Sequence, residues 1–124
     1  MKLRLLDDSI RLRLSRSDVL TVDDSGVAEG RTRFPGGASF TFALEAVAEP
    51  EASADFVDNR LVVRLPAGDV RSWAHDDNAV SLRGELALAD GEHLKLLVEK
   101  DFECLTPREG EDQGDMFPNP DSNC

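Results

Sequence analysis

Apolar and polar residues alternate along several short stretches of the chain. In residues 9–14, Ile10, Leu12 and Leu14 are separated by Arg11 and Arg13. A period of two is typical of a strand with one buried face, because successive side chains on a strand point to opposite sides. Similar stretches predict further strands over 2–6, 27–34, 38–47, 54–57, 60–65, 79–88 and 93–102.

Turn-forming residues connect these strands in pairs. Residues 7–8 are Asp-Asp and residues 58–59 are Asp-Asn, two residue types that tolerate the left-handed backbone of a tight hairpin. Residues 35–37 are Pro-Gly-Gly and residues 90–91 are Asp-Gly. These segments also favour turns, because glycine adopts many backbone conformations and proline has a fixed φ angle. The sequence therefore predicts four hairpins.

The segment after the second strand predicts a short helix. Ser15 or Ser17 can cap its first turn, and Asp18 lies where an acidic side chain interacts favourably with a helix N-terminus. We expect Val19, Leu20 and Val22 to face inward. Turn formers at 23–26 predict the end of this helix.

A second short helix is predicted after the sixth strand. Pro66 suits a helix start, and Asp69 lies in the first turn. Val70 and Trp73 are three residues apart and share one face, which we expect to be buried. The turn formers at 76–78 predict its end.

The order of these elements repeats, and so does part of the sequence. Residues 5–19 align with 56–70, and residues 27–34 and 40–45 align with 79–86 and 94–99. The first alignment has identical residues at Asp7/Asp58, Arg13/Arg64, Leu14/Leu65, Asp18/Asp69 and Val19/Val70. We therefore predict a duplicated ββαββ unit, with repeat 1 at about 2–47 and repeat 2 at about 54–102.

This pattern predicts an α+β fold: a mainly antiparallel β sandwich or barrel made from the duplicated ββαββ unit, with two short helices. Hairpin pairing is antiparallel, so we expect the sheet to be antiparallel. Each copy has one apolar sheet face, and the simplest arrangement buries the two faces against each other with the helices at the ends or edges.

Length and charge restrict the class of protein further. The 124 residues include 14 Lys and Arg against 25 Asp and Glu, for a net charge of −11. This length suits one domain, which we place at 1–104. An excess of negative charge argues against contact with nucleic-acid phosphates or anionic membranes, and no apolar stretch reaches the ~20 residues that cross a bilayer. No secretion signal opens the chain, so we expect a cytoplasmic protein.

Residues 105–124 differ in character and predict an irregular, acidic, proline-containing C-terminal tail. Met116 and Phe117 are its large apolar residues after Leu105. Two alternatives remain open for this tail, either a solvated extension or a segment that lies back on the domain through these two side chains.

Nearly the whole chain resembles a family of small uncharacterised bacterial proteins, a domain of unknown function. The resemblance rests on residues 1–19 (MKLRLLDDSIRLRLSRSDV), 97–105 (LVEKDFECL) and 111–120 (EDQGDMFPNP). It implies a single-domain, cytoplasmic, bacterial protein, and it implies no activity, cofactor or catalytic residue.

Arginines on the predicted strands are the main candidates for binding. Alternation places Arg11 and Arg13 on one side of a strand, and it does the same for Arg31 and Arg33; Arg64 is the repeat equivalent of Arg13. Such a sheet face suits a small anionic ligand or an acidic protein partner. We therefore predict a non-enzymatic binding module without a cofactor, whose Arg-bearing face the acidic tail could mask.

Two other functions remain as alternatives. A small metal- or carboxylate-dependent hydrolase would use His93 with strand-borne acids, and a zinc site would need four ligands to converge. A structural homodimer subunit would form through edge-strand pairing. The candidate zinc ligands are His75, His93, Cys104 and Cys124, and the candidate catalytic acids are Glu45, Glu99, Asp101 and Glu103.

Overall fold

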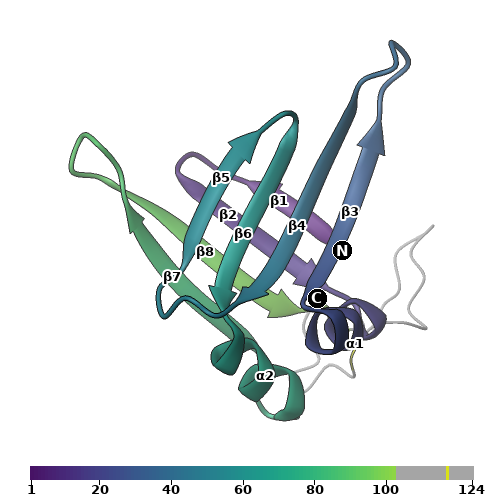
Figure 1. Cartoon of the computed structure of the whole chain (residues 1–124), viewed down its shortest axis with the longest axis vertical. Coiled ribbons are helices and arrows are strands. Elements are labelled where there is room, and N and C mark those ends of the chain that lie inside the picture. The colour runs from purple at the N-terminus through teal and green to yellow at the C-terminus, as the bar shows by residue number, and fades with distance from the viewer. Residues whose placement is uncertain (103–116, 118–124) are drawn as a thin grey trace.

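The computed structural model describes residues 1–102 and Phe117, and it contains two helices and eight strands in this part of the chain (Figure 1). In chain order the elements are β1 (Lys2–Leu5), β2 (Ser9–Leu14), α1 (Arg16–Ser25), β3 (Val27–Arg33), β4 (Ser39–Val47), β5 (Ser53–Val57), β6 (Arg60–Pro66), α2 (Ala67–His75), β7 (Ser81–Ala87) and β8 (His93–Lys100). The predicted elements and the α+β class are confirmed. Apart from Phe117, the tail predicted at 105–124 lies outside the described residues.

The strands form two four-stranded sheets, which we call sheet A (β1-β2-β8-β7) and sheet B (β3-β4-β6-β5). The outer pairs of both sheets are antiparallel hairpins, as predicted. The central pairs, β2 with β8 and β4 with β6, are parallel. The prediction of a mainly antiparallel fold is therefore confirmed, and the parallel pairing at the centre of each sheet is an addition that the hairpin pattern did not indicate.

Each sheet combines one hairpin from each half of the chain. Sheet A joins β1-β2 to β7-β8, and sheet B joins β3-β4 to β5-β6. The expectation that each half forms its own sheet was wrong for a topological reason. Each helix carries the chain from one sheet to the other, so the strands on either side of it cannot be neighbours.

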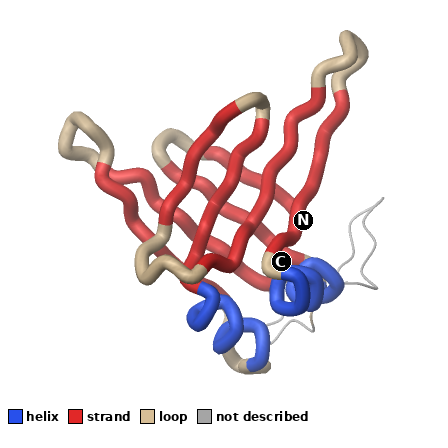
Figure 2. The backbone as a smooth tube through the Cα atoms, in the orientation of Figure 1, coloured by secondary structure: helices blue, strands red, loops and turns tan. Residues whose placement is uncertain are grey.

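The two sheets face each other without closing into a barrel, so of the two predicted forms the sandwich is the appropriate one (Figure 1). In Figure 2 the hairpin turns lie away from the two helices and spread from the left, where β7-β8 turns, to the top right, where β3-β4 turns. We call the end with turns 6–8, 34–38, 58–59 and 88–92 the hairpin end. The opposite end is the helical end.

The core fills the space between the sheets and continues under the helices. Its strand residues come from alternate positions of the central strands, such as Leu12 and Leu14 of β2 and Val98 of β8, all nearly inaccessible to solvent. The helices add Val19, Val22, Val70 and Trp73. Burial is therefore confirmed for Val19, Val22, Val70 and Trp73, whereas the expectation for Leu20 was wrong, because it lies on the solvent side of α1 and is 63 % exposed.

The predicted turn and capping residues also have the expected geometry. Asp7, Asp58 and Asn59 have positive φ angles of 46°, 52° and 60°. The Ser15 side chain accepts a hydrogen bond from the backbone of Asp18, whose carboxylate accepts one from the backbone of Ser15 in return. These local interactions fix both the hairpins and the start of α1.

Pairing in the two sheets corrects one part of the repeat alignment. Gly30 of β3 lies opposite Phe42, and Gly84 of β7 lies opposite Leu96. Because Phe42 and Leu96 are themselves aligned by the 40–45/94–99 match, Gly84 is the equivalent of Gly30. The alignment of 27–34 with 79–86 was therefore wrong by two residues.

Candidate functional site

The five candidate arginines do not form one surface. Arg11 and Arg13 alternate with the buried residues of β2 and lie on the outer face of sheet A. Arg31 and Arg33 of β3 and Arg64 of β6 lie on the outer face of sheet B. A ligand that contacts one group therefore cannot contact the other across the core.

On sheet A the arginines are paired with one carboxylate. The Nε atoms of Arg11 and Arg13 each donate to Glu99 Oε1 over 2.7 Å. Glu99 of β8 lies directly opposite Arg13 in the parallel pair, and its side chain is largely shielded. This arrangement is a cross-strand ion-pair cluster within the sheet.

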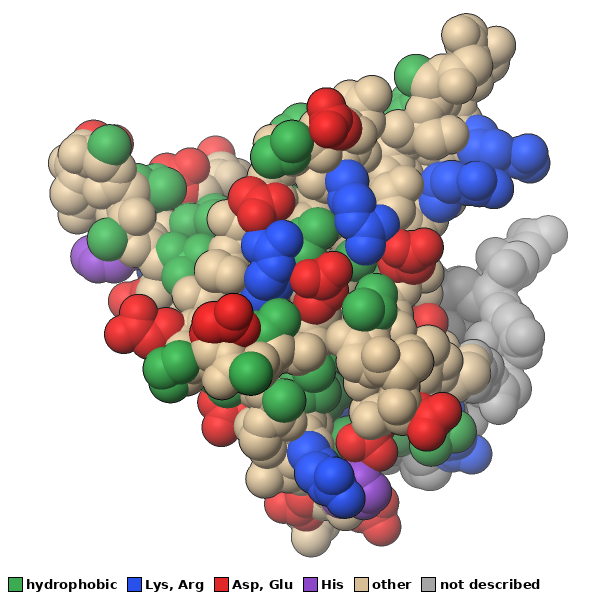
Figure 3. Space-filling view, in the orientation of Figure 1, with side chains coloured by type: hydrophobic (Ala, Val, Ile, Leu, Met, Phe, Trp, Pro, Cys, Tyr) green, Lys and Arg blue, Asp and Glu red, His purple; other side chains and the backbone are tan. Residues whose placement is uncertain are grey.

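Sheet B contains the equivalent cluster. Arg64 Nε donates to Glu45 Oε1 over 3.1 Å, and its Nη1 donates to Asp55 Oδ2 over 2.6 Å. The hydrogen bond that Arg64 donates to Asp55 and the negative charges of Asp55 and Glu45 raise the pKa of Arg64 above its ordinary value. In Figure 3 acidic and basic side chains alternate across this face. The Arg64–Glu45 pair of sheet B matches the Arg13–Glu99 pair of sheet A.

Arg31 and Arg33 differ from the other three. Both are exposed at the outer end of edge strand β3, and neither has an ion-pair partner within residues 1–102 and 117. Among the described residues, no carboxylate therefore occupies their guanidinium groups.

The candidate zinc and hydrolase residues are dispersed. His75 ends α2 and its Nε2 lies 2.8 Å from Asp23 Oδ2 of α1, whereas His93 begins β8 at the hairpin end. β8 alone is roughly 23 Å long at the usual rise per residue, so one metal ion cannot bind both histidines. No group of three or more potential metal ligands occurs in the described part of the chain. Cys104, Cys124 and Glu103 lie outside the described residues.

The candidate acids are also separated from one another. Glu45 and Glu99 lie on opposite outer faces, and each is bound by arginine. Asp101 lies at the helical end, where its Oδ2 is 3.1 Å from Lys2 Nζ. Each of these three acids thus has an ion-pair partner, and Glu45 lies across the core from Glu99 and does not share a site with it.

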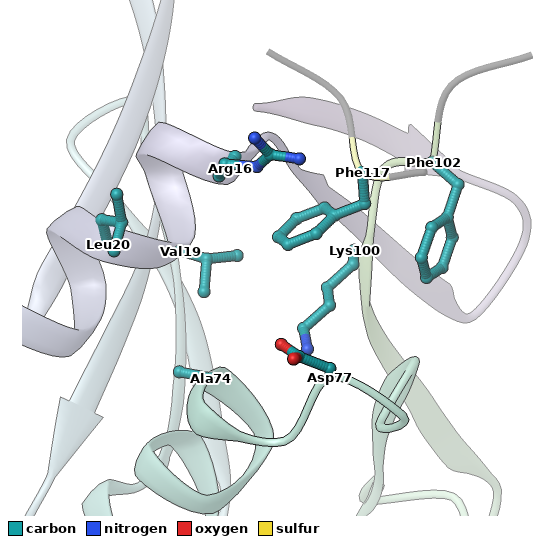
Figure 4. A pocket seen from close by; sticks show the side chains of 8 residues that line it. All are labelled: Arg16, Val19, Leu20, Ala74, Asp77, Lys100, Phe102 and Phe117. Carbon is teal, nitrogen blue, oxygen red and sulfur yellow. The ribbon is translucent and has the colours of Figure 1, made fainter. Parts of the chain in front are cut away.

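A different set of residues lines a pocket at the helical end (Figure 4). It lies between α1 and α2 and has a volume of about 590 Å³. We call it the interhelical pocket. Its lining combines an apolar wall with two cations and one acid: Val19, Leu20, Ala74, Phe102, Phe117, Arg16, Lys100 and Asp77.

Lys100 is the most unusual residue of this pocket. The residue is only 4 % exposed, and Nζ donates a hydrogen bond to the backbone oxygen of Asp76 over 2.8 Å. Nζ also lies 5.6 Å from the centre of the Trp73 ring and 5.4 Å from that of Phe117. Burial lowers the pKa of Lys100, against the opposing charges of Asp77 and Asp76. A buried ammonium with one hydrogen-bond acceptor retains further donor capacity.

Phe117 closes one side of the pocket. Its backbone N–H donates to the oxygen of Asp101 over 2.8 Å, and its ring packs edge to face against Phe102 with centroids 5.8 Å apart. Arg16 lies over the same ring. Phe117 therefore contacts the domain, as the second of the two alternatives for the tail predicts. Met116 lies outside the described residues.

Sequence analysis missed the interhelical pocket, although one signal was present. Leu94, Leu96 and Val98 define the inward face of β8, and Lys100 continues the same period of two. A charged residue at an inward position of a strand is the sequence signal that indicates the interhelical pocket.

The fold and pocket define a small two-layer α+β domain with an open cavity between its helices. The chain belongs to a family of unknown function, DUF7009, whose model matches residues 1–121. Comparison with curated proteins and with solved structures found no significant match. In the part of the chain that the structure describes, neither helix has the length and apolar character required to cross a bilayer.

Proposed function

We propose that this protein is a non-enzymatic binding module that takes a small anionic ligand with an apolar body into the interhelical pocket. The observation that supports this function best is the buried ammonium of Lys100. Burial of a charge is unfavourable unless it is paired, and Lys100 Nζ has one backbone acceptor and no ion-pair partner within residues 1–102 and 117. A carboxylate or phosphate beside Nζ would supply that partner.

The rest of the pocket suits the other parts of such a ligand. Val19 and Leu20 of α1 and Ala74 of α2 offer apolar contacts, and Leu20 is 63 % exposed at the rim. Arg16 provides a second cation at the opening. Asp77 disfavours a ligand with a large negative charge, so we propose a single carboxylate or phosphate group.

Octanoate and its uncharged counterpart octanol are suitable probes of this proposal. Trp73 is the sole tryptophan and lies against Lys100, so its fluorescence reports on the pocket. We expect octanoate to bind more tightly than octanol. Lys100→Met should lower the affinity for octanoate by about 10- to 100-fold, because it removes one charge-assisted hydrogen bond.

Lys95→Met is the matched control, because it removes the same charge from an exposed position of the same strand. It should leave octanoate binding within about twofold of the unmodified protein, since exposed charges interact weakly through solvent. Equal losses in the two variants, or equal affinity for octanoate and octanol, would contradict a site centred on Lys100.

We also propose that Arg31 and Arg33 bind an anion, which retains part of the Arg-bearing sheet face predicted from the sequence. The supporting observation is that both lack an ion-pair partner within residues 1–102 and 117, whereas Arg11, Arg13 and Arg64 have one. We expect inorganic phosphate to shift the NMR signals of β3 and not those of β2. Arg31→Gln with Arg33→Gln should abolish those shifts, and Arg11→Gln should leave them; the reverse pattern would exclude this surface.

We also infer that the chain arose by duplication of one ββαββ unit, in a bacterial cytoplasmic protein. Two features support the duplication: the element order repeats, and the Arg13–Glu99 and Arg64–Glu45 pairs occupy matching positions. Superposition of residues 2–47 on 54–102 in a crystal structure tests this inference. If the two halves do not superimpose, the inference of a duplication is wrong.

A further inference from the structure

Apolar side chains gather in solvent at the tips of two hairpins. Among the described residues, Leu5 and Leu6 of the β1-β2 hairpin are 58 % and 57 % exposed. Phe56 and Val57 of the β5-β6 hairpin are 59 % and 61 % exposed. Both hairpins turn at the hairpin end of the sandwich, far from the interhelical pocket (Figure 1). We call these four residues the apolar tip patch.

The apolar tip patch continues the core. Leu5 lies opposite the buried Ile10 in sheet A, and Phe56 lies opposite the buried Leu61 in sheet B, so both side chains belong to the inward faces of their sheets. The Phe56 ring is 5.7 Å from that of Phe40, which packs on the core in turn. Leu5 and Phe56 thus lie at the solvent-exposed edge of the space between the sheets, whereas Val57, opposite Arg60, lies on the outer side of sheet B.

The same two positions are exposed and apolar in both halves of the chain. Leu5 aligns with Phe56 and Leu6 aligns with Val57, each pair directly before a turn that contains a positive φ. Exposed single apolar residues are ordinary, but a set that recurs at matching positions and adjoins the core marks an interaction surface.

The charge around the patch specifies the kind of partner. Asp7, Asp8 and Asp58 form the adjoining turns, are exposed, and have no ion-pair partner within the described chain. The backbone N–H of Lys95 donates a hydrogen bond to the backbone oxygen of Asp8, and Lys95 occupies an outward position of β8. A second copy of this chain would bring the same acids together, and each copy carries a net charge of −11. A basic partner would neutralise them.

We propose that the apolar tip patch is a docking surface for a basic segment of another protein that presents an apolar stripe. Leu5 and Phe56 contact the stripe, and Asp7, Asp8 and Asp58 pair with the flanking cations. This surface is independent of the proposed ligand site, because the two lie at opposite ends of the sandwich. Either proposal can therefore fail without the other.

A synthetic helical peptide of lysine and leucine, with its leucines on one face, is the probe. Its binding to the full chain would be followed by fluorescence anisotropy of a dye on the peptide. We expect Leu5→Ser with Phe56→Ser to weaken binding at least about tenfold, because hot-spot side chains dominate an interface. Circular dichroism would verify that the double variant is folded.

Phe34→Ser is the matched control, because Phe34 is 52 % exposed but lies in the turn of the β3-β4 hairpin, outside the apolar tip patch and outside the interhelical pocket. It should change the affinity less than about twofold, and a scrambled peptide without an apolar face should bind no better to the unmodified chain than to the double variant. An equal loss in Phe34→Ser would mean nonspecific attraction to an acidic protein and would overturn the proposal. Light scattering that showed a dimer dissociated by Leu5→Ser would overturn it in favour of self-association.

Discussion

Trp73→Ala is expected to lower the free energy of unfolding by about 3–5 kcal/mol, the usual loss when a fully buried large aromatic side chain is removed. Trp73 is 2 % exposed and is the largest of the fully buried side chains. Its Nε1 donates to the backbone oxygen of Val80 over 3.0 Å and so ties α2 to the segment that leads into β7. The substitution removes both the packing and this hydrogen bond.

Two further variants separate these contributions. Trp73→Phe keeps much of the ring but loses the donor, so we expect a loss of about 1–3 kcal/mol, the cost of an unsatisfied carbonyl and a smaller cavity. Leu20→Ala removes an exposed side chain from the other helix and should change stability by less than about 0.5 kcal/mol. Urea denaturation followed by circular dichroism measures all three. A Trp73→Ala protein as stable as the unmodified chain would show that α2 does not depend on this anchor.

The anchor also bears on the interhelical pocket. Trp73 lies beneath Lys100, with its ring 5.6 Å from the ammonium nitrogen. A ring face attracts a cation, which offsets part of the cost of burying Lys100. The pocket therefore depends on the same residue that anchors α2, and a stability defect in Trp73 variants should be accompanied by weaker ligand binding.

Local features of the fold were predictable from sequence because their causes are local. Alternation defines which face of β2 is buried, and Ser15, Asp18 and Gly26 fix the beginning and end of α1 through their own backbone contacts. Asp7 and Asp58 adopt the left-handed conformation that a tight hairpin needs. None of these interactions requires knowledge of distant residues.

The order of strands was not predictable in the same way. Alternation in β2 indicates a buried face but does not identify the neighbour, and the parallel partner β8 lies more than 70 residues further along the chain. The carboxylate of Glu99 likewise belongs to Arg11 and Arg13 only because this pairing brings the strands together. The candidate arginines and acids therefore form ion pairs with one another. The interhelical pocket is lined by residues of α1, α2 and β8, which are distant in sequence.

Gly30→Ala is expected to cost about 1–3 kcal/mol, the usual range for overpacking a core. Gly30 faces the Phe42 ring across the β3-β4 pair, and a Cβ atom there would lie 2.6 Å from Cζ and 2.8 Å from Cε2 of that ring. The ring has little freedom to move, because Phe42 is 8 % exposed and packs against Phe40. Thermal and urea unfolding would measure the loss.

Gly84→Ala is the matched control for this prediction, because Gly84 occupies the same position in the other sheet. A Cβ atom at Gly84 would meet Ala52 Cβ at 3.5 Å and Leu96 Cδ1 at 3.7 Å, which are ordinary contacts. We expect a change of less than about 0.5 kcal/mol, or a small gain because alanine restricts the unfolded chain. Phe42→Leu should recover part of the loss in a Gly30→Ala background, since the two sites are coupled. If the losses in Gly30→Ala and Phe42→Leu simply add, the ring is not what excludes a side chain at Gly30.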